Sequence, residues 1–397
     1  MARLDLKGSR PAAVKLITIT LPAVAIVSVA LVLATEAWVR ATFDPRGGTP
    51  GLYVADPARG MRLAPNYTGW FAGVPVQTNS LGLRDNREYA LAKSPKTFRI
   101  LVLGDSVTFG HGSVAEHTYP RLLEGLLRAW RPDVDWQVWN AAVPGYNTSQ
   151  ELAQLLELGP IAGPDLVVVG FYENDVVDNF DVAPPGPLTA AVTGVRAFAQ
   201  RHFYSFDMYR KIWLTLQWKL SASDAYRRRL EALGNEDKMY RRPAEIVDRE
   251  RQALTPYERL DDNVVRGLQC RDGQKPDPTL ADAIQHDPDW PRWLNAVHGF
   301  ERLHASGAYR IVFFLNVVPV VCPDGDIYYD GGISVENDLF LKTVSRSMPA
   351  VSTLDAFLHR RPSQMPYAQA HAIGNANLTK AETLFEYLKD RQLVPPQ

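Results

Sequence analysis

Three short motifs place small or polar residues directly after apolar stretches that have the length of β-strands. Gly104-Asp105-Ser106 follows the first stretch, Gly145 lies in NAAVPGYNT after the second, and GFYEND ends the third with Asn174 and Asp175. A serine hydroxyl at such a position can attack an acyl carbon. The N–H groups of Ser106 and Gly145 and the side-chain amide of Asn174 would hold the oxygen on which negative charge develops. Each motif alone is common, and Asn174-Asp175 could simply cap a helix, but together they predict acyl transfer.

The elements that must position these residues alternate along the chain. Apolar stretches of strand length occupy residues 98–104, 136–143, 165–171, 310–318 and 351–357, and helical patterns occupy 119–130 and 149–158. Stretches that are apolar throughout are typical of parallel strands covered on both faces. We therefore expect an α/β fold, a flavodoxin-like three-layer α/β/α sandwich with a central parallel sheet of about five strands. Ligands bind beyond the carboxyl ends of such strands, where the three motifs lie.

The motifs resemble the sequence blocks of the SGNH hydrolase superfamily, which includes the GDSL esterases and lipases. Gly104-Asp105-Ser106 matches the GDS of the first block, Gly145 matches the glycine of the second, and residues 170–175 match a lengthened form of the third, GxND. The resemblance covers about residues 97–175 and 309–390. The lead-in TNSLGLRD also resembles segments that precede the domain in membrane-anchored bacterial members.

The resemblance implies a serine esterase that acts on acyl esters of carbohydrate or lipid, such as O-acetyl esters, through an acyl-serine intermediate. Ser106 would be the nucleophile, with Asp105, Asp175 and Gln369 as candidate supporting residues. An acyltransferase that modifies a cell-surface polysaccharide would use the same site, since only the attacking hydroxyl differs. A catalytically weak member that binds glycan or serves as a scaffold is a third hypothesis.

A serine nucleophile needs a base, and the family places a histidine just before the final helix. His371 has this position, so we favour it as the general base. A rival alignment puts Asn375-Ala-Asn377 at the family's His-x-Asn pattern. Because asparagine cannot act as a base, that alignment predicts an inactive or altered protein.

The carboxylate that orients the histidine in the family is missing here. Ala368 and Gln369 stand three and two residues before His371, where the family has aspartate. The oxygen of Gln369 or a backbone carbonyl could hold the imidazole, Asp355 near the last strand could stand in, or the protein could be catalytically weak. His111 lies close enough to Ser106 in the sequence to line the site, but we expect it to be a solvated loop residue.

The N-terminal region contains an apolar run without charged side chains, Leu16–Ala34, which is about long enough to cross a bilayer as a helix. Four basic residues precede it: Arg3, Lys7, Arg10 and Lys15. The positive-inside rule then keeps the short tail in the cytoplasm and places the rest of the chain outside it. The alternative is a cleaved signal peptide, but the run is longer than a usual signal core. We therefore expect a single-pass cell-membrane protein with an extracytoplasmic (periplasmic or extracellular) catalytic domain.

The chain divides into three parts by composition. Residues 1–43 form the tail and transmembrane anchor, residues 44–96 a linker and lead-in, and residues 97–397 the SGNH hydrolase-like domain. A stretch at about 180–285 interrupts the strand–helix alternation, and we interpret it as a helical insertion because it is too long for an unstructured loop.

The composition excludes some classes of partner. The net charge is −1, which leaves no electrostatic footprint for nucleic acid. The scattered histidines and two cysteines show no metal-ligand spacing, so we expect no metal or organic cofactor. Cys270 and Cys322 could form a disulfide in an oxidising compartment or remain separate thiols. The glycine-rich loop after Ser106 lacks the lysine of a phosphate-binding fingerprint.

Overall fold

The computed structural model describes residues 16–42, 48–177, 187–220, 261, 264, 279–317, 320–321, 328–329, 333–360, 367–368 and 371–396. Much of the expected insertion at 180–285 therefore lies outside the described residues. The same holds for Gln369, Cys270 and Cys322.

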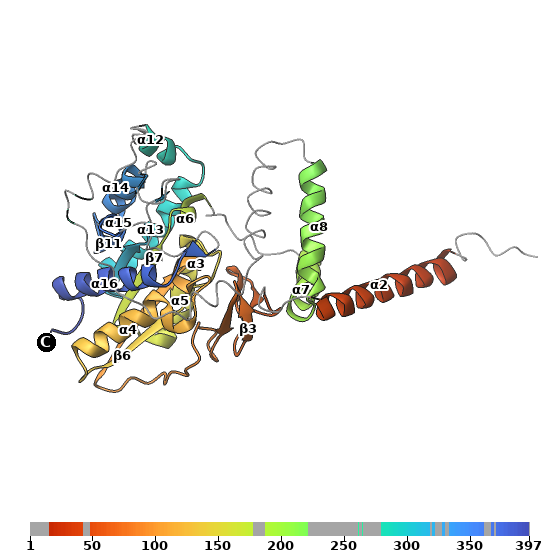
Figure 1. Cartoon of the computed structure of the whole chain (residues 1–397), viewed down its shortest axis with the longest axis horizontal. Coiled ribbons are helices and arrows are strands. Elements are labelled where there is room, and N and C mark those ends of the chain that lie inside the picture. The colour runs from red at the N-terminus through yellow and green to blue at the C-terminus, as the bar shows by residue number, and fades with distance from the viewer. Residues whose placement is uncertain are drawn as a thin grey trace, which may run out of the picture.

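A five-stranded parallel sheet forms the centre of the protein (Figure 1). Its strands, in the spatial order β11-β8-β7-β5-β6, are β5 (Thr97–Gly104), β6 (Asp135–Asn140), β7 (Leu166–Phe171), β8 (Ile311–Leu315) and β11 (Ala350–Ser352). The expected parallel sheet with flanking helices is confirmed. The last stretch differs in extent, because residues 354–357, expected as strand, lie in helix α15 (Leu354–Leu358).

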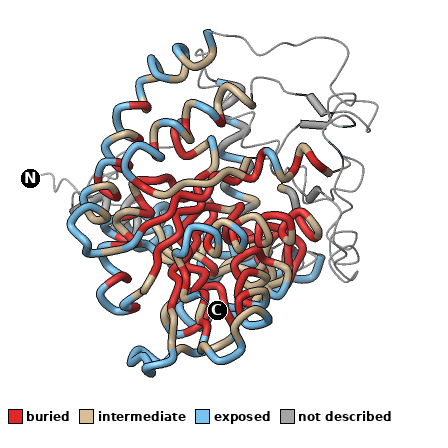
Figure 2. The backbone as a smooth tube through the Cα atoms, turned by 90° about the vertical axis from the view of Figure 1, so that its left-hand side faces the viewer, coloured by how far each residue is buried: buried red, intermediate tan, exposed pale blue. Residues whose placement is uncertain are grey.

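Helices cover both faces of the sheet because alternate strand residues point to opposite sides. Leu101 and Leu103 of β5 join a hydrophobic cluster with helices α5 (Thr148–Ala162), α13 (Trp290–Ala305) and α14 (Ile333–Val344). Ile100 and Val102 join a second cluster with helices α4 (Tyr119–Trp130) and α16 (Asn375–Asp390). Figure 2 shows the resulting pattern, with buried residues concentrated in the centre and exposed residues on the outer turns of the helices.

The order of the strands changes direction at β5. The chain passes from β5 to β6 on one side and then back across to β7 on the other. The carboxyl ends of β5 and β7 are therefore neighbours, with Gly104 opposite Gly170. This is the switch point at which open α/β sheets bind their ligands. The segments that carry Ser106 and Asn174 start from these two strand ends.

Two hairpins lie in the segment that we interpret as a linker and lead-in. They are β1 (Tyr53–Asp56) with β2 (Gly60–Leu63), and β3 (Thr68–Phe71) with β4 (Val74–Gln77). Their buried side chains, such as Leu63 and Val76, form a third hydrophobic cluster with Phe109, Tyr146 and Ile373, which flank the catalytic motifs in the sequence. The hairpins therefore help to position the loops around Ser106.

The remaining elements are short, or lie near the N-terminus and between β7 and β8. They are a π-helix (Leu16–Thr20), α2 (Leu21–Thr42), α3 (Ser106–Phe109), a 3₁₀ turn (Ala115–His117), α6 (Asn174–Val177), α7 (Pro187–His202), α8 (Ser205–Leu220), α12 (Leu280–Gln285), β9 (Val320–Val321), β10 (Tyr328–Tyr329), β12 (Tyr367–Ala368) and β13 (His371–Ala372). The helical residues Thr18–Thr42, with a mean hydropathy of 2.2, are long and apolar enough to cross a membrane, a test that a signal sequence also passes.

Candidate active site

Ser106 lies at the sharp turn between β5 and α3. Gly104 ends the strand with φ = +152°, a backbone conformation that side chains disfavour. Asp105 caps α3, because its carboxylate accepts a 2.9 Å hydrogen bond from the N–H of Val107. Ser106 is then the first residue of the helix, with its hydroxyl 3.4 Å from Asp105 Oδ2.

His371 reaches the same hydroxyl from the C-terminal part of the chain. It lies in β13, just before α16, and its Nε2 is 2.8 Å from Ser106 Oγ. This distance allows the imidazole to accept the serine proton. In the rival alignment Asn375 takes the position of the base, and it is the first residue of α16. Asn377 of the same alignment is buried in α16, where its amide donates to Ser113 Oγ at 3.0 Å. The residue that the structure brings to Ser106 Oγ is His371.

The three expected oxyanion donors lie at the carboxyl ends of three neighbouring strands. The N–H of Ser106 opens α3, where the first N–H groups of a helix have no carbonyl partner within it. Gly145 follows β6 with φ = +82°, a conformation that requires glycine at this turn. Asn174 begins α6 three residues after the end of β7. This arrangement suits stabilisation of a tetrahedral intermediate.

His111 is a residue of the site whose environment the sequence reasoning misjudged. It is buried rather than solvated, with 8% of its surface exposed. Its ring stacks on that of His371 at a centroid distance of 4.3 Å and an interplanar angle of 13°. Phe71 of β3 packs edge-on against the other side, 5.1 Å away. The one sequence signal that pointed to His111 was its proximity to Ser106. Its burial depends on a hairpin of the lead-in segment and therefore could not be read from the sequence around it.

The loop that carries His111 is held by an arginine from the same lead-in segment. The buried guanidinium of Arg84 donates to the carbonyl oxygens of Phe109, Gly110 and Ser113. It also lies over the ring of Phe109, 4.2 Å from the centroid. Arg84 thereby holds two carbonyl groups before His111 and one after it, which helps to fix the position of the His111 ring.

The candidate supporting residues have different surroundings. Asp175 is fully buried and accepts from the hydroxyl of Thr148 at 3.3 Å. Asp355 lies in α15 with 82% of its side chain exposed, and its carboxylate is 3.4 Å from His359 Nδ1. Gln369 lies outside the described residues.

Four ionisable groups are buried beside the nucleophile: Asp105, Glu151, Asp175 and Lys380, each at most 1% exposed. Burial raises the pKa of Asp105 to about 6, although the N–H of Val107 and the charge of Lys380 oppose the shift. Burial also raises the pKa values of Glu151 and Asp175 well above the ordinary range. It lowers the pKa of Lys380 to about 8, against the attraction of Asp105. The opposite charges of Asp105 and Lys380 therefore attract each other within this buried cluster.

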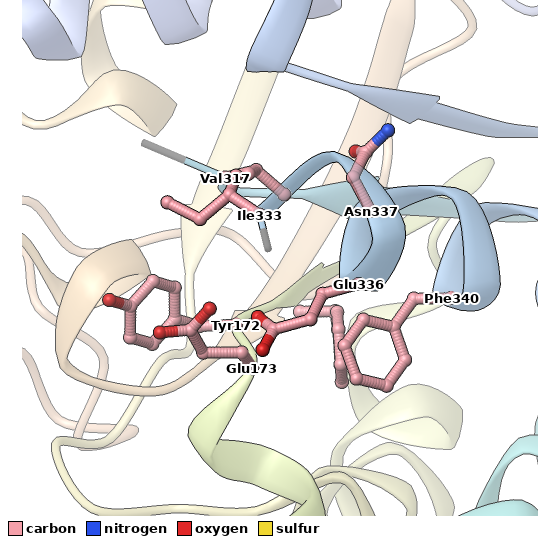
Figure 3. A pocket seen from close by; sticks show the side chains of 8 residues that line it. Tyr172, Glu173, Val317, Ile333, Glu336, Asn337 and Phe340 are labelled. Carbon is pink, nitrogen blue, oxygen red and sulfur yellow. The ribbon is translucent and has the colours of Figure 1, made fainter. Parts of the chain in front are cut away.

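A separate small hollow opens beside the end of β7 (Figure 3). It is lined by Phe171, Tyr172, Glu173, Val317, Ile333, Glu336, Asn337 and Phe340. The carboxylates of Glu173 and Glu336 face each other there, and burial together with Glu173 raises the pKa of Glu336 to about 7. Neither Ser106 nor His371 lines this hollow. Among the residues that the structure describes, no cluster of three or more His, Cys, Asp or Glu side chains could hold a metal ion.

Comparisons with known proteins agree with this site. Residues 102–262 match the model of the GDSL-like Lipase/Acylhydrolase family. A curated arylesterase of Vibrio mimicus is 34% identical over 99 residues, which are 25% of this chain. The match spans 47% of that relative, about half its length.

The comparison with solved structures finds proteins that are distant in sequence. A variant of Axe2, an acetyl xylan esterase from Geobacillus stearothermophilus, is 14% identical with a TM-score of 0.35, covering 75% of this chain and 97% of its own. TesA is 12% identical with a TM-score of 0.36, covering 75% of this chain and 99% of its own. These scores support no argument about activity, and the fold rests on the sheet described above.

Proposed function

We propose that this protein is a serine esterase that cleaves small acyl esters of carbohydrate or lipid. The observation that carries the proposal is the 2.8 Å contact between Ser106 Oγ and His371 Nε2 at the switch point of the sheet. A nucleophile paired with a base at this place is the minimum equipment for acyl transfer. The GDSL-like lipase/acylhydrolase match supports the same reaction class.

The reaction proceeds through an acyl-serine. Ser106 Oγ attacks the ester carbon while His371 Nε2 takes the hydroxyl proton. The N–H groups of Ser106 and Gly145 and the amide of Asn174 stabilise the negative oxygen. Collapse of the intermediate breaks the ester C–O bond, and the alcohol leaves with the proton from His371. Water then attacks the acyl-serine by the same route, which releases the carboxylic acid and restores Ser106.

The imidazole works here as part of a serine–histidine pair. In a triad the carboxylate orients the ring and stabilises its cation. In this protein the ring of His111 stacks on that of His371 and so helps to fix the plane of the imidazole.

We also propose that α2 is an uncleaved anchor and that the esterase domain lies outside the cytoplasm. The length and hydropathy of Thr18–Thr42 support the anchor. The basic residues before it support the orientation. The acyl esters nearest to such an enzyme are those of envelope glycans and lipids, which supports O-acetyl groups as the first substrates to test.

Hydrolysis of 4-nitrophenyl acetate by the full chain tests the proposal. We expect Ser106→Ala and His371→Ala to lower kcat by at least about 10²-fold, the usual contribution of a positioned base. Ser306→Ala and His286→Ala are matched controls, because both residues are exposed and lie on or beside helices away from the site. Equal rates for the parent and Ser106→Ala would overturn the esterase proposal. Adding an oligosaccharide acceptor shows whether the acyl group passes to water or to sugar.

A further inference from the structure

Helix α8 carries an apolar stripe that faces away from the protein. Tyr209, Ile212, Trp213, Leu216 and Leu220 recur at helical spacing, and between 39% and 83% of each side chain is exposed. Such a stripe normally faces a core. Exposed clusters of large apolar side chains of this kind mark an interaction surface.

The preceding helix α7 extends the same kind of surface. Val195 and Phe198, one helical turn apart, are 72% and 60% exposed. The two helices are joined by a short turn and contact each other. We call the exposed apolar residues of α7 and α8 the apolar hairpin face.

The start of α8 is bound to the C-terminal part of α2. Glu36 of α2 accepts hydrogen bonds from the N–H of Tyr204 at 3.1 Å and from the N–H and hydroxyl of Ser205 at 2.9 and 2.7 Å. Glu36 is 6% exposed, so this contact is protected from water. Arg40, which pairs with Glu36, donates to the carbonyl oxygen of His202 and lies over the ring of Tyr204. The apolar hairpin face is thus fixed to the candidate span.

The sequence of α2 indicates where the membrane surface would lie. Residues 16–35 carry no charge, and Glu36 is the first charged residue after Lys15. Twenty helical residues span about 30 Å, the thickness of the hydrocarbon layer. Glu36 therefore marks the water boundary, and Trp38, which is 62% exposed, lies where tryptophan is enriched in membrane proteins.

Helix α8 begins at that boundary and runs crosswise to α2 (Figure 1). If α2 crosses a bilayer, α8 then lies along its surface. Figure 1 also shows the catalytic domain beyond the C-terminal end of α2. The catalytic domain and α8 therefore lie on the same side of the proposed membrane.

We propose that the apolar hairpin face lies in the interfacial layer of the bilayer that α2 spans, as a second membrane contact. The inference rests on the proposed anchor. We take lipid, rather than a protein partner, to cover the apolar hairpin face. The reason is that Glu36 joins the start of α8 to α2, a helix whose own apolar side chains are exposed along its length. An amphipathic helix in this orientation binds by burying its apolar stripe at the boundary between headgroups and acyl chains.

Site-specific fluorescence in vesicles tests the proposal on the full chain. Cys270→Ser and Cys322→Ser provide a background without thiols. Single cysteines are introduced by Trp213→Cys, Leu220→Cys, Val29→Cys and Asp338→Cys and are labelled with an environment-sensitive dye. Val29 reports on the anchor, and Asp338, whose side chain is 63% exposed on α14, reports on water. The chain is reconstituted in phosphatidylcholine–phosphatidylglycerol vesicles with and without brominated acyl chains.

We expect brominated lipid to quench the labels at positions 29, 213 and 220 but to leave the label at 338 unchanged. Quenching at 29 without quenching at 213 and 220 would overturn the inference and leave the anchor intact. No quenching at 29 would instead refute the anchor itself. A label at 213 or 220 that is shielded from both lipid and a water-soluble quencher would show that protein covers the face, which also overturns the inference.

Discussion

At the scale of single residues, Asn174 is the proposed oxyanion donor whose effect can be isolated most cleanly. Asn174→Ala removes a donor that acts on the transition state more than on the bound ester. We expect kcat for 4-nitrophenyl acetate to fall by about 10²–10³-fold with little change in KM. Steady-state kinetics measure both constants. A rise in KM at constant kcat would contradict this role and assign Asn174 to substrate binding.

His111 is a positioning residue in this account, and two substitutions separate that role from others. His111→Ala removes the stacked ring, and we expect kcat to fall by up to about tenfold, because aromatic pairs contribute about 0.5–1.5 kcal/mol. His111→Phe keeps a ring and should restore most of the rate with an unchanged pH–rate profile. If His111 were itself the base, His111→Phe would lose activity as completely as His371→Ala.

Much of the site can be predicted from the sequence because its residues follow strands. Ser106, Gly145 and Asn174 lie at the ends of three strands that are recognisable as apolar stretches. The burial of His111 could not be predicted, since it depends on Phe71 and Arg84 from a segment that resembles a linker. Long-range side-chain contacts of this kind leave no local pattern in the sequence.

At the scale of elements, Arg84 shows that the lead-in belongs to the catalytic structure. Arg84→Met removes the guanidinium from three carbonyl oxygens, of which that of Gly110 keeps the N–H of Ser113 as a donor. The loss should lower the free energy of unfolding by about 1–3 kcal/mol. Because the same loop carries His111, we expect activity to fall as well. Urea unfolding and ester hydrolysis measure the two effects. Arg292→Met, which removes a half-exposed guanidinium paired with Asp289 on α13, is the control and should change both far less.

The elements themselves were predicted well where the strands are buried on both faces. β5, β7 and β8 coincide closely with three of the expected stretches. The end of the chain was harder, because the stretch 351–357 contributes only the short edge strand β11 and then turns into α15. An edge strand such as β11 has a neighbouring strand on one side only. Its side chains are therefore less enclosed, and its apolar pattern is weaker.

At the scale of the whole molecule, the N-cap of α3 and helices α5, α6 and α16 bring their buried ionisable groups together beside Ser106. The pKa of Asp105 is about 6 in the folded state, above its ordinary value of 3.8. The folded state therefore retains a proton that the unfolded chain releases, and the stability contributed by this group is lost as the pH rises from about 4 to 6. Lys380 has the opposite shift, so its contribution is lost as the pH falls from about 10.5 to about 8.

Lys380→Met tests this arrangement. At pH 7 the substitution removes the positive charge that attracts the ionised Asp105, and we expect the free energy of unfolding to fall by about 1–2 kcal/mol. At pH 5 Asp105 is protonated, so the same substitution should cost much less. Urea unfolding at both pH values measures the difference. A penalty that does not depend on pH would show that Lys380 acts through packing alone.

The long connection between β7 and β8 has a consequence for how this protein can change over evolutionary time. These strands are neighbours in the sheet, and α13 alone would serve as their crossover. Of the other described helices in this connection, α7 and α8 contact β1, α2 and each other, and they follow Asn174 in the sequence. Exchange of this one stretch between related proteins could alter which ester is accepted while the reacting groups stay in place. Catalytic competence and substrate preference would then be inherited as separable modules of one polypeptide.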